Sequence, residues 1–181
     1  MAGSALFSAA PYHILSYGTL LGTSFYQSFI NGPVMFRSTN RTTFSTVQSG
    51  LFPIYFGMQT FLPIIMIFTF PGNAILGFNS GISGLFADVN RVPSMLPILT
   101  MFITGFINLA VMLPAVTQLI QARQGQSKRD GKDWYAEGPH SDEMVALNKK
   151  FGAMHGLSSL INLATFISAI TYGFTLAGRL L

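Results

Sequence analysis

The side chains of this sequence with the most chemical capacity lie inside long apolar segments. Early in the chain Gln27 and Asn31 stand four residues apart, and near its end a second polar group consists of His155, Ser158, Ser159 and Asn162. Residues three, four or seven positions apart share one face of a helix. In a membrane-spanning helix, such a face usually turns toward the protein interior and is the first place to look for function. The sequence therefore predicts two polar helix faces that can hydrogen-bond a ligand or each other.

Catalysis and metal binding find little support in these residue types. A histidine beside two serines could activate a hydroxyl nucleophile, but no Asp or Glu occurs near His155 to orient it, and no G-x-S-x-G motif is present. His13, His140 and His155 are scattered along the chain, cysteine is absent, and phosphate-loop and dinucleotide-binding motifs are missing. We therefore predict a non-enzymatic protein with no catalytic residue, no metal site and no cofactor.

The elements that must position these residues are long apolar helices. Of the 181 residues, 50% are hydrophobic and 9% are charged, whereas an average soluble domain has about 25% charged residues. Four segments without Asp, Glu, Lys or Arg exceed the roughly 20 residues that a helix needs to cross a bilayer; they are residues 13–36, 46–70, 95–120 and 151–178. The sequence predicts an all-α, polytopic integral membrane protein, a single transmembrane domain over residues 1–181 with four transmembrane helices in an antiparallel bundle.

Proline occurs repeatedly within these segments, at Pro33, Pro53, Pro63, Pro97 and Pro114. In a soluble helix each would cost about 3 kcal/mol. In a membrane the cost of exposed backbone keeps the segment helical, and neighbouring groups satisfy the freed carbonyls. We therefore expect bent helices.

The distribution of Lys and Arg predicts the orientation and argues against nucleic acid as a partner. Residues 37–45 and the charged loop 121–150 contain most of them, namely Arg37, Arg41, Arg123, Lys128, Arg129, Lys132, Lys149 and Lys150, whereas the other side contains Arg91 and Arg179. Cytosolic loops carry the excess of positive charge. Both termini are therefore expected on the non-cytosolic side, with loop 121–150 cytosolic and mobile unless a partner orders it.

Two readings of the polar faces remain open. The depth of each side chain can be counted from the cytosolic end of its helix at about 1.5 Å of rise per residue. On this count the side chains of the two faces are expected to meet in the cytosolic half of the membrane. They could form a cavity, capped by Arg37 and Arg41, for an anionic head group or a small polar ligand. They could instead be hydrogen-bonding contacts that fix the register of neighbouring helices.

Two glycine pairs predict close helix packing. Gly18 with Gly22, and Gly152 with Gly156, have the G-x-x-x-G spacing that lets a second helix approach closely. The contact could lie within the monomer or between copies in a homo-oligomer.

Two stretches resemble the transmembrane protein 205 family. They are QSFINGPVMFRSTNRTTFSTVQSGLFPIYF, residues 27–56, and NKKFGAMHGLSSLINL, residues 148–163. The matching positions include Gln27, Arg37, Arg41, Gln48, His155, Ser158, Ser159 and Asn162. The resemblance implies an integral membrane protein without an agreed activity, in an endomembrane such as the endoplasmic reticulum rather than in the mitochondrial or plasma membrane.

Together the residues and the resemblance predict a multi-pass membrane protein that binds a small molecule, lipid or partner helix. The predicted ligand-binding residues are Gln27, Asn31, Arg37, Arg41, Gln48, His155, Ser158, Ser159 and Asn162. One alternative is a scaffold or assembly subunit that contacts a partner through loop 121–150. A second is a membrane-embedded lipid-modifying enzyme with His155 as general base.

Overall fold

The computed structural model describes residues 7–72 and 79–179, which form helices and no strands. In chain order the elements are α2 (Ala9–Phe25), the π-helical turn η1 (Tyr26–Asn31), α3 (Gly32–Ser38), α4 (Arg41–Phe68), α5 (Gly81–Leu85), the 3-10 turn η2 (Asp88–Asn90), the π-helical turn η3 (Arg91–Met95), α6 (Leu96–Ile107), the π-helical turn η4 (Asn108–Met112), α7 (Leu113–Asp130) and α8 (Asp142–Gly178).

Three helical stretches are long and apolar enough to cross a membrane: Arg41–Phe68, Asp88–Asp130 and Asp142–Gly178. These stretches indicate a membrane-embedded protein. The predicted first span, residues 13–36, lies in a continuous helical stretch from Ala9 to Ser38 but is not among the three, because its many Ser, Thr, Tyr, Gln and Asn residues lower its hydropathy. A fourth crossing stays a prediction.

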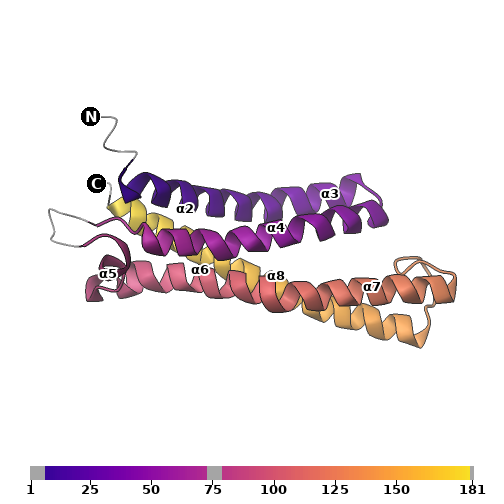
Figure 1. The fold of residues 1–181 in the computed structure, drawn as a ribbon. Helices are drawn as coiled ribbons and strands as arrows, with labels where there is room; N and C mark the ends of the chain where they lie inside the picture. Colours follow the sequence, from indigo (N-terminus) through magenta and orange to yellow (C-terminus); the bar gives the residue numbers. More distant parts are fainter. Residues whose placement is uncertain (1–6, 73–78, 180–181) are drawn as a thin grey trace.

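The long helices run side by side, and their packing is tightest at one end. α2 and α3 lie along α4, and α6 and α7 lie along α8 (Figure 1). α6 packs extensively against both α4 and α8, whereas α7 packs against α8 and barely touches α4. The two pairs of helices therefore separate toward the end where α3, α7 and the start of α8 lie.

The hydrophobic core lies at the opposite, closed end, where α2, α4, α6 and α8 pack together. Its buried members include Leu20, Met66, Ile98 and Tyr172, which come from four different helices. His13 is fully buried there. Its Nε2 lies 2.6 Å from the Tyr172 hydroxyl, and its Nδ1 lies 3.1 Å from the Met66 carbonyl oxygen. This histidine thus joins α2 to α4 and α8 as part of the core.

Three of the five prolines within the predicted spans lie just after a π-helical turn. η1 precedes Pro33, η3 precedes Pro97 and η4 precedes Pro114. A proline ring removes one backbone donor and clashes with the carbonyl four residues earlier, and a π turn, which has one extra residue, widens the helix at that point. Pro53 and Pro63 instead lie inside the continuous helix α4.

The charged segment is more helical than the sequence analysis predicted. α7 continues to Asp130 and α8 begins at Asp142, so the expected loop 121–150 is confined to residues 131–141. The flanking Gln, Ala, Lys and Arg residues are good helix formers. Gly131, with φ of 62°, ends α7 in the left-handed region, and the Ser141 side chain caps α8 by accepting from the Met144 N–H.

Side-chain contacts hold this hairpin together. The Arg123 guanidinium lies 4.1 Å from the Trp134 ring centroid and 4.2 Å from that of Phe151, and its Nε donates to Asn148 Oδ1 at 2.8 Å. Ser141 Oγ donates to Asp130 Oδ2 at 2.7 Å. These contacts lie within the segment that was expected to be mobile, and a partner for it stays a prediction.

The predicted glycine contacts differ from the observed ones. A Cβ added at Gly18, Gly22, Gly152 or Gly156 would meet nothing within 4 Å, so the proposal that they pack helices within the monomer is wrong. The close approach instead occurs at Gly105, where a Cβ would lie 2.6 Å from the Gln59 carbonyl oxygen. Spacing alone does not reveal which helix face meets a neighbour. Contact between copies through the four outward glycines stays a prediction.

Candidate functional site

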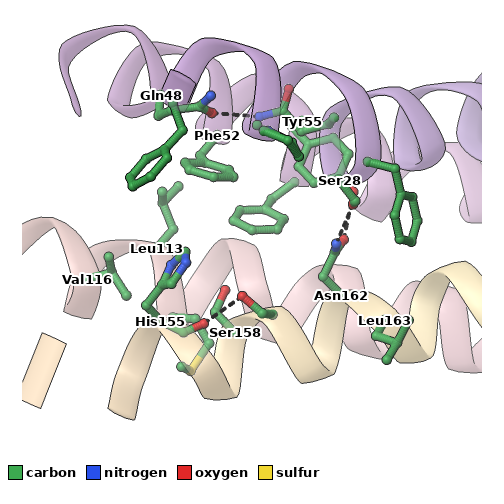
Figure 2. Close-up of a pocket in the computed structure, with 18 of the residues that line it drawn as sticks. Ser28, Gln48, Phe52, Tyr55, Leu113, Val116, His155, Ser158, Asn162 and Leu163 are labelled. Carbon is green, nitrogen blue, oxygen red and sulfur yellow. Dashed lines mark hydrogen bonds between the residues drawn. The ribbon is translucent and has the colours of Figure 1, made fainter. Parts of the chain in front are cut away.

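A cavity of about 690 Å³ lies where the two pairs of helices separate. Its walls come from η1, α3 and α4 on one side and from η4, α7 and α8 on the other (Figure 2). Most of the predicted ligand-binding residues line it: Gln27, Arg37, Gln48, His155, Ser158, Ser159 and Asn162. Residues more than 100 positions apart in the sequence thus meet around one space.

Asn31 and Arg41 are not part of the cavity wall, contrary to the sequence analysis. Asn31 Nδ2 donates to Gln27 Oε1 at 2.8 Å. The Arg41 guanidinium lies 3.5 Å from the Phe36 ring centroid, and its Nη1 donates to the Phe36 carbonyl oxygen at 3.2 Å. Both side chains contact residues of the wall, and the Arg41 guanidinium forms a cation–π contact with the Phe36 ring.

A directed chain of amides runs along one wall. Asn31 donates to Gln27, and Gln27 Nε2 donates to Gln48 Oε1 at 2.7 Å. Gln48 is 5% exposed, and its own Nε2 has no hydrogen-bond partner among the described residues. A buried donor without a partner costs free energy, so the chain ends in a group that an acceptor on a ligand would satisfy.

Asn162 lies in the cavity wall and connects α8 to α4 and η1. Its Oδ1 accepts from the Tyr55 hydroxyl at 2.7 Å and from Gln59 Nε2 at 2.8 Å. Its Nδ2 donates to Ser28 Oγ at 2.9 Å, and Gln59 Nε2 also reaches Ser24 Oγ at 3.2 Å. The two readings of the polar faces are therefore compatible, because Asn162 both joins helices and lines the cavity.

The serines next to His155 are engaged in helix contacts. Ser158 Oγ donates to Asn108 Oδ1 at 2.9 Å, and Asn108 Nδ2 donates back to the Ser158 carbonyl oxygen at 3.3 Å. Ser159 Oγ donates to the His155 carbonyl oxygen at 2.9 Å. Neither hydroxyl forms a hydrogen bond with the His155 ring among the described residues, as a nucleophile paired with its base would.

His155 projects from α8 toward the space between the helices, close to Leu113 and Val116 (Figure 2). Its ring stacks on Phe151, with centroids 5.6 Å apart and planes 2° apart. No Asp or Glu is among the described residues that line the cavity, so no carboxylate in the wall can orient the imidazole. His155 offers a ring nitrogen for hydrogen bonding to a bound molecule.

The aromatic part of the wall was missed by the sequence analysis. The lining includes the rings of Phe29, Phe36, Phe44, Phe52, Tyr55, Phe56 and Phe166. Phe44, Gln48, Phe52 and Phe56 recur every four residues along α4, which places them on one face. That spacing was readable in the sequence, but an aromatic stripe is also what an ordinary packed helix presents.

The fold and the cavity define a helical, membrane-embedded protein with an aromatic pocket edged by amides. The chain belongs to the family described as domain of unknown function DUF4149, whose model matches residues 15–125. It is similar to "Xanthocillin biosynthesis cluster protein D" of Aspergillus fumigatus, with 29% identity over 171 residues, covering 94% of this chain and 90% of the relative. No solved structure matches. The narrower resemblance to the transmembrane protein 205 family stays a prediction.

Proposed function

We propose that this protein binds a small apolar molecule or lipid in the cavity between α4 and the η4–α7–α8 wall and does not transform it. The observation that carries this proposal is the cavity itself, with a volume of about 690 Å³ and a wall that combines aromatic rings with a few amides and hydroxyls, one imidazole and the guanidinium of Arg37. Ligand pockets commonly occupy about 300–1,000 Å³, with mostly apolar walls and a few polar groups that fix orientation.

Binding is preferred over catalysis because the wall contains hydrogen-bonding groups without an acid–base pair. Asn162 and Gln48 are held by other amides, and the His155 ring has no carboxylate beside it in the lining. A lipid-modifying reaction with His155 as base would need a partner that the lining does not supply.

The proposed setting is a multi-pass protein with four transmembrane helices in an antiparallel bundle. The stretch from Ala9 to Ser38 would be the fourth crossing, because it lies along α4 over its whole length (Figure 1). The excess of Lys and Arg at the open end supports a cytosolic position for that end, with both termini non-cytosolic. We retain the endomembrane location and the transmembrane protein 205 resemblance as parts of this proposal.

The name of the relative supports a role near small molecules. That protein is named as a product of a biosynthesis cluster, and a membrane protein that holds an apolar intermediate or product would fit such a setting. Its identity to this chain extends over nearly the whole length of both, so the cavity region falls within the compared residues.

Native mass spectrometry of the full chain, extracted gently from its own membrane, tests the proposal. A Val116→Phe, Leu163→Phe variant fills the cavity, since both residues line it. A Leu160→Phe, Ile167→Phe variant is the control, because these residues are exposed on α8, the helix of Leu163, and do not line the cavity. A co-purifying mass that the first variant loses and the control keeps is the expected result. Equal occupancy in all three proteins, or none in any, would refute binding at this cavity.

A further inference from the structure

A second cavity, of about 370 Å³, lies at the open end of the same cleft. Thr42 and Ser45, from the first turns of α4, form one side. The last turns of α7 and the hairpin that follows form the other side, with Gln124, Ser127, Lys128, Gly131, Lys132, Asp133 and Trp134. Hydroxyl and ammonium groups dominate this lining.

The two lysines of this second cavity form no salt bridge among the described residues. Among the described residues the one salt bridge joins Arg91 to Asp88 at the other end of the molecule, so neither Lys128 nor Lys132 is ion-paired there. Lys132 Nζ donates a single hydrogen bond, to the Pro139 carbonyl oxygen at 2.9 Å, which leaves two of its three donors.

A buried hydroxyl in the same cavity also lacks a partner. Ser127 Oγ is inaccessible to solvent and has no hydrogen-bond partner within the described part of the chain. A ligand cannot reach this buried oxygen as it stands, so the charged donors open to a ligand are the ammonium groups of Lys128 and Lys132. Charged and hydroxyl donors converging on one space are the groups that bind phosphate oxygens.

The two cavities follow one another along the same two helices. On α4, Ser45 lines the second cavity and Phe52 lines the aromatic one, seven residues or about 10 Å further along the helix. On α7, Val116 lines the aromatic cavity and Gln124 the second, about 12 Å apart. A cationic, hydroxyl-rich space thus opens next to an apolar one within the length of a lipid chain.

We propose that the two cavities together bind one anionic amphiphile, with a phosphate-bearing head at Lys128 and Lys132 and an apolar chain among the aromatic rings. This inference rests on the proposed function and names the ligand class of that site. It moves the head-group position from Arg37 and Arg41, where the sequence analysis expected it, to the hairpin. Asp133 lies in the same lining and opposes the head group, so it limits affinity.

Trp134 provides a direct signal for this binding. It is the single tryptophan of the chain and lines the second cavity, so its fluorescence responds to occupancy without labelling. The purified full chain in detergent is titrated with three matched probes: oleoyl lysophosphatidic acid, which has head and tail; monoolein, which has the tail without phosphate; and glycerol 3-phosphate, which has the head without the tail. Native mass spectrometry counts the bound molecules in parallel.

The lysophosphatidic acid is expected to bind at least about tenfold more tightly than either of the other probes, since each lysine near a membrane surface contributes severalfold to anion binding. A Lys128→Gln, Lys132→Gln variant should remove about tenfold of that affinity and leave monoolein binding unchanged. Lys149→Gln with Lys150→Gln is the matched control, because these exposed lysines lie outside both cavities and should have no effect. Asp133→Asn should tighten binding of the phosphate probe.

The outcomes separate this inference from the proposed function. Equal binding of monoolein and lysophosphatidic acid, with no effect of the lysine substitutions, would overturn the anionic-head assignment and leave the apolar binding site standing. Glycerol 3-phosphate binding as tightly as the lipid would instead make the second cavity a site for a free phosphate compound and overturn the joint site. No binding of any probe, in fluorescence or in mass spectrometry, would overturn both.

Discussion

The close approach of α6 to the backbone of α4 gives a sharp test of the packing. Gly105 on α6 faces the backbone of α4, where a Cβ would lie 2.6 Å from the Gln59 carbonyl oxygen, 2.7 Å from its carbonyl carbon and 3.1 Å from its Cβ. Non-bonded carbons prefer about 3.5–4.0 Å. The Gly105→Ala substitution therefore requires the two helices to move apart by most of an ångström.

Because the obstacle is backbone, no side-chain rotation relieves it. Overpacking of this kind usually costs about 1–3 kcal/mol, partly offset here by the better helix propensity of alanine, worth up to about 1 kcal/mol. We expect a net loss of about 1–2 kcal/mol, seen as a lower midpoint of thermal unfolding by circular dichroism in detergent. The displacement should also weaken the hydrogen bonds of the Gln59 side chain to Ser24 and Asn162.

Gly152→Ala is the matched control. An added Cβ there meets nothing within 4 Å, so the substitution should leave the unfolding midpoint unchanged or raise it. If Gly105→Ala were as stable as Gly152→Ala, the close approach of α4 and α6 would be refuted, and with it the account of which glycines pack this bundle.

Three further perturbations test the site and the hairpin. Asn162→Leu should lower the free energy of unfolding by about 1–3 kcal/mol, because it leaves buried donors unpaired; equal stability in a denaturant titration would argue against the network. Arg123→Gln removes the guanidinium between two rings and should cost about 1 kcal/mol, accompanied by a shift in Trp134 emission, whereas an unchanged spectrum would contradict the stacking. Ser141→Ala removes the cap of α8 and should cost about 1 kcal/mol and speed proteolysis of residues 131–141; an unchanged cleavage rate would count against the cap.

Much of the site could be predicted because polar residues are conspicuous in apolar helices. Gln27, His155 and Asn162 stand out against their neighbours, and their depth from the helix ends placed them near one another. The structure brings them to one cavity. The partners of Asn162 were less visible, since Tyr55 and Ser28 are residue types that also occur on lipid-facing and packed surfaces.

The failures have physical causes that a single sequence does not reveal. The G-x-x-x-G spacing identifies a face on which a helix can be approached, but the approach itself depends on the rotation of each helix, so Gly105 was missed and Gly152 was misread. The charged segment was predicted to be a loop because its residues are too polar for the membrane. A helix can nevertheless continue outside the membrane. Only the left-handed Gly131 and the Ser141 cap mark the true ends.

The π-helical turns have a consequence for how such a chain changes over evolutionary time. A π turn is a helix with one residue more than its α-helical counterpart, and η4 lies between Asn108, which holds Ser158, and Leu113, which lines the cavity. Deleting one residue there would turn the π turn into an α-helical turn and leave the flanking segments close to their present register, whereas a deletion in the regular part of α7 would rotate the residues beyond it by about 100° relative to those before it. The π turns are thus the positions at which a descendant of this protein can lose one residue and still present the same side chains to its pocket.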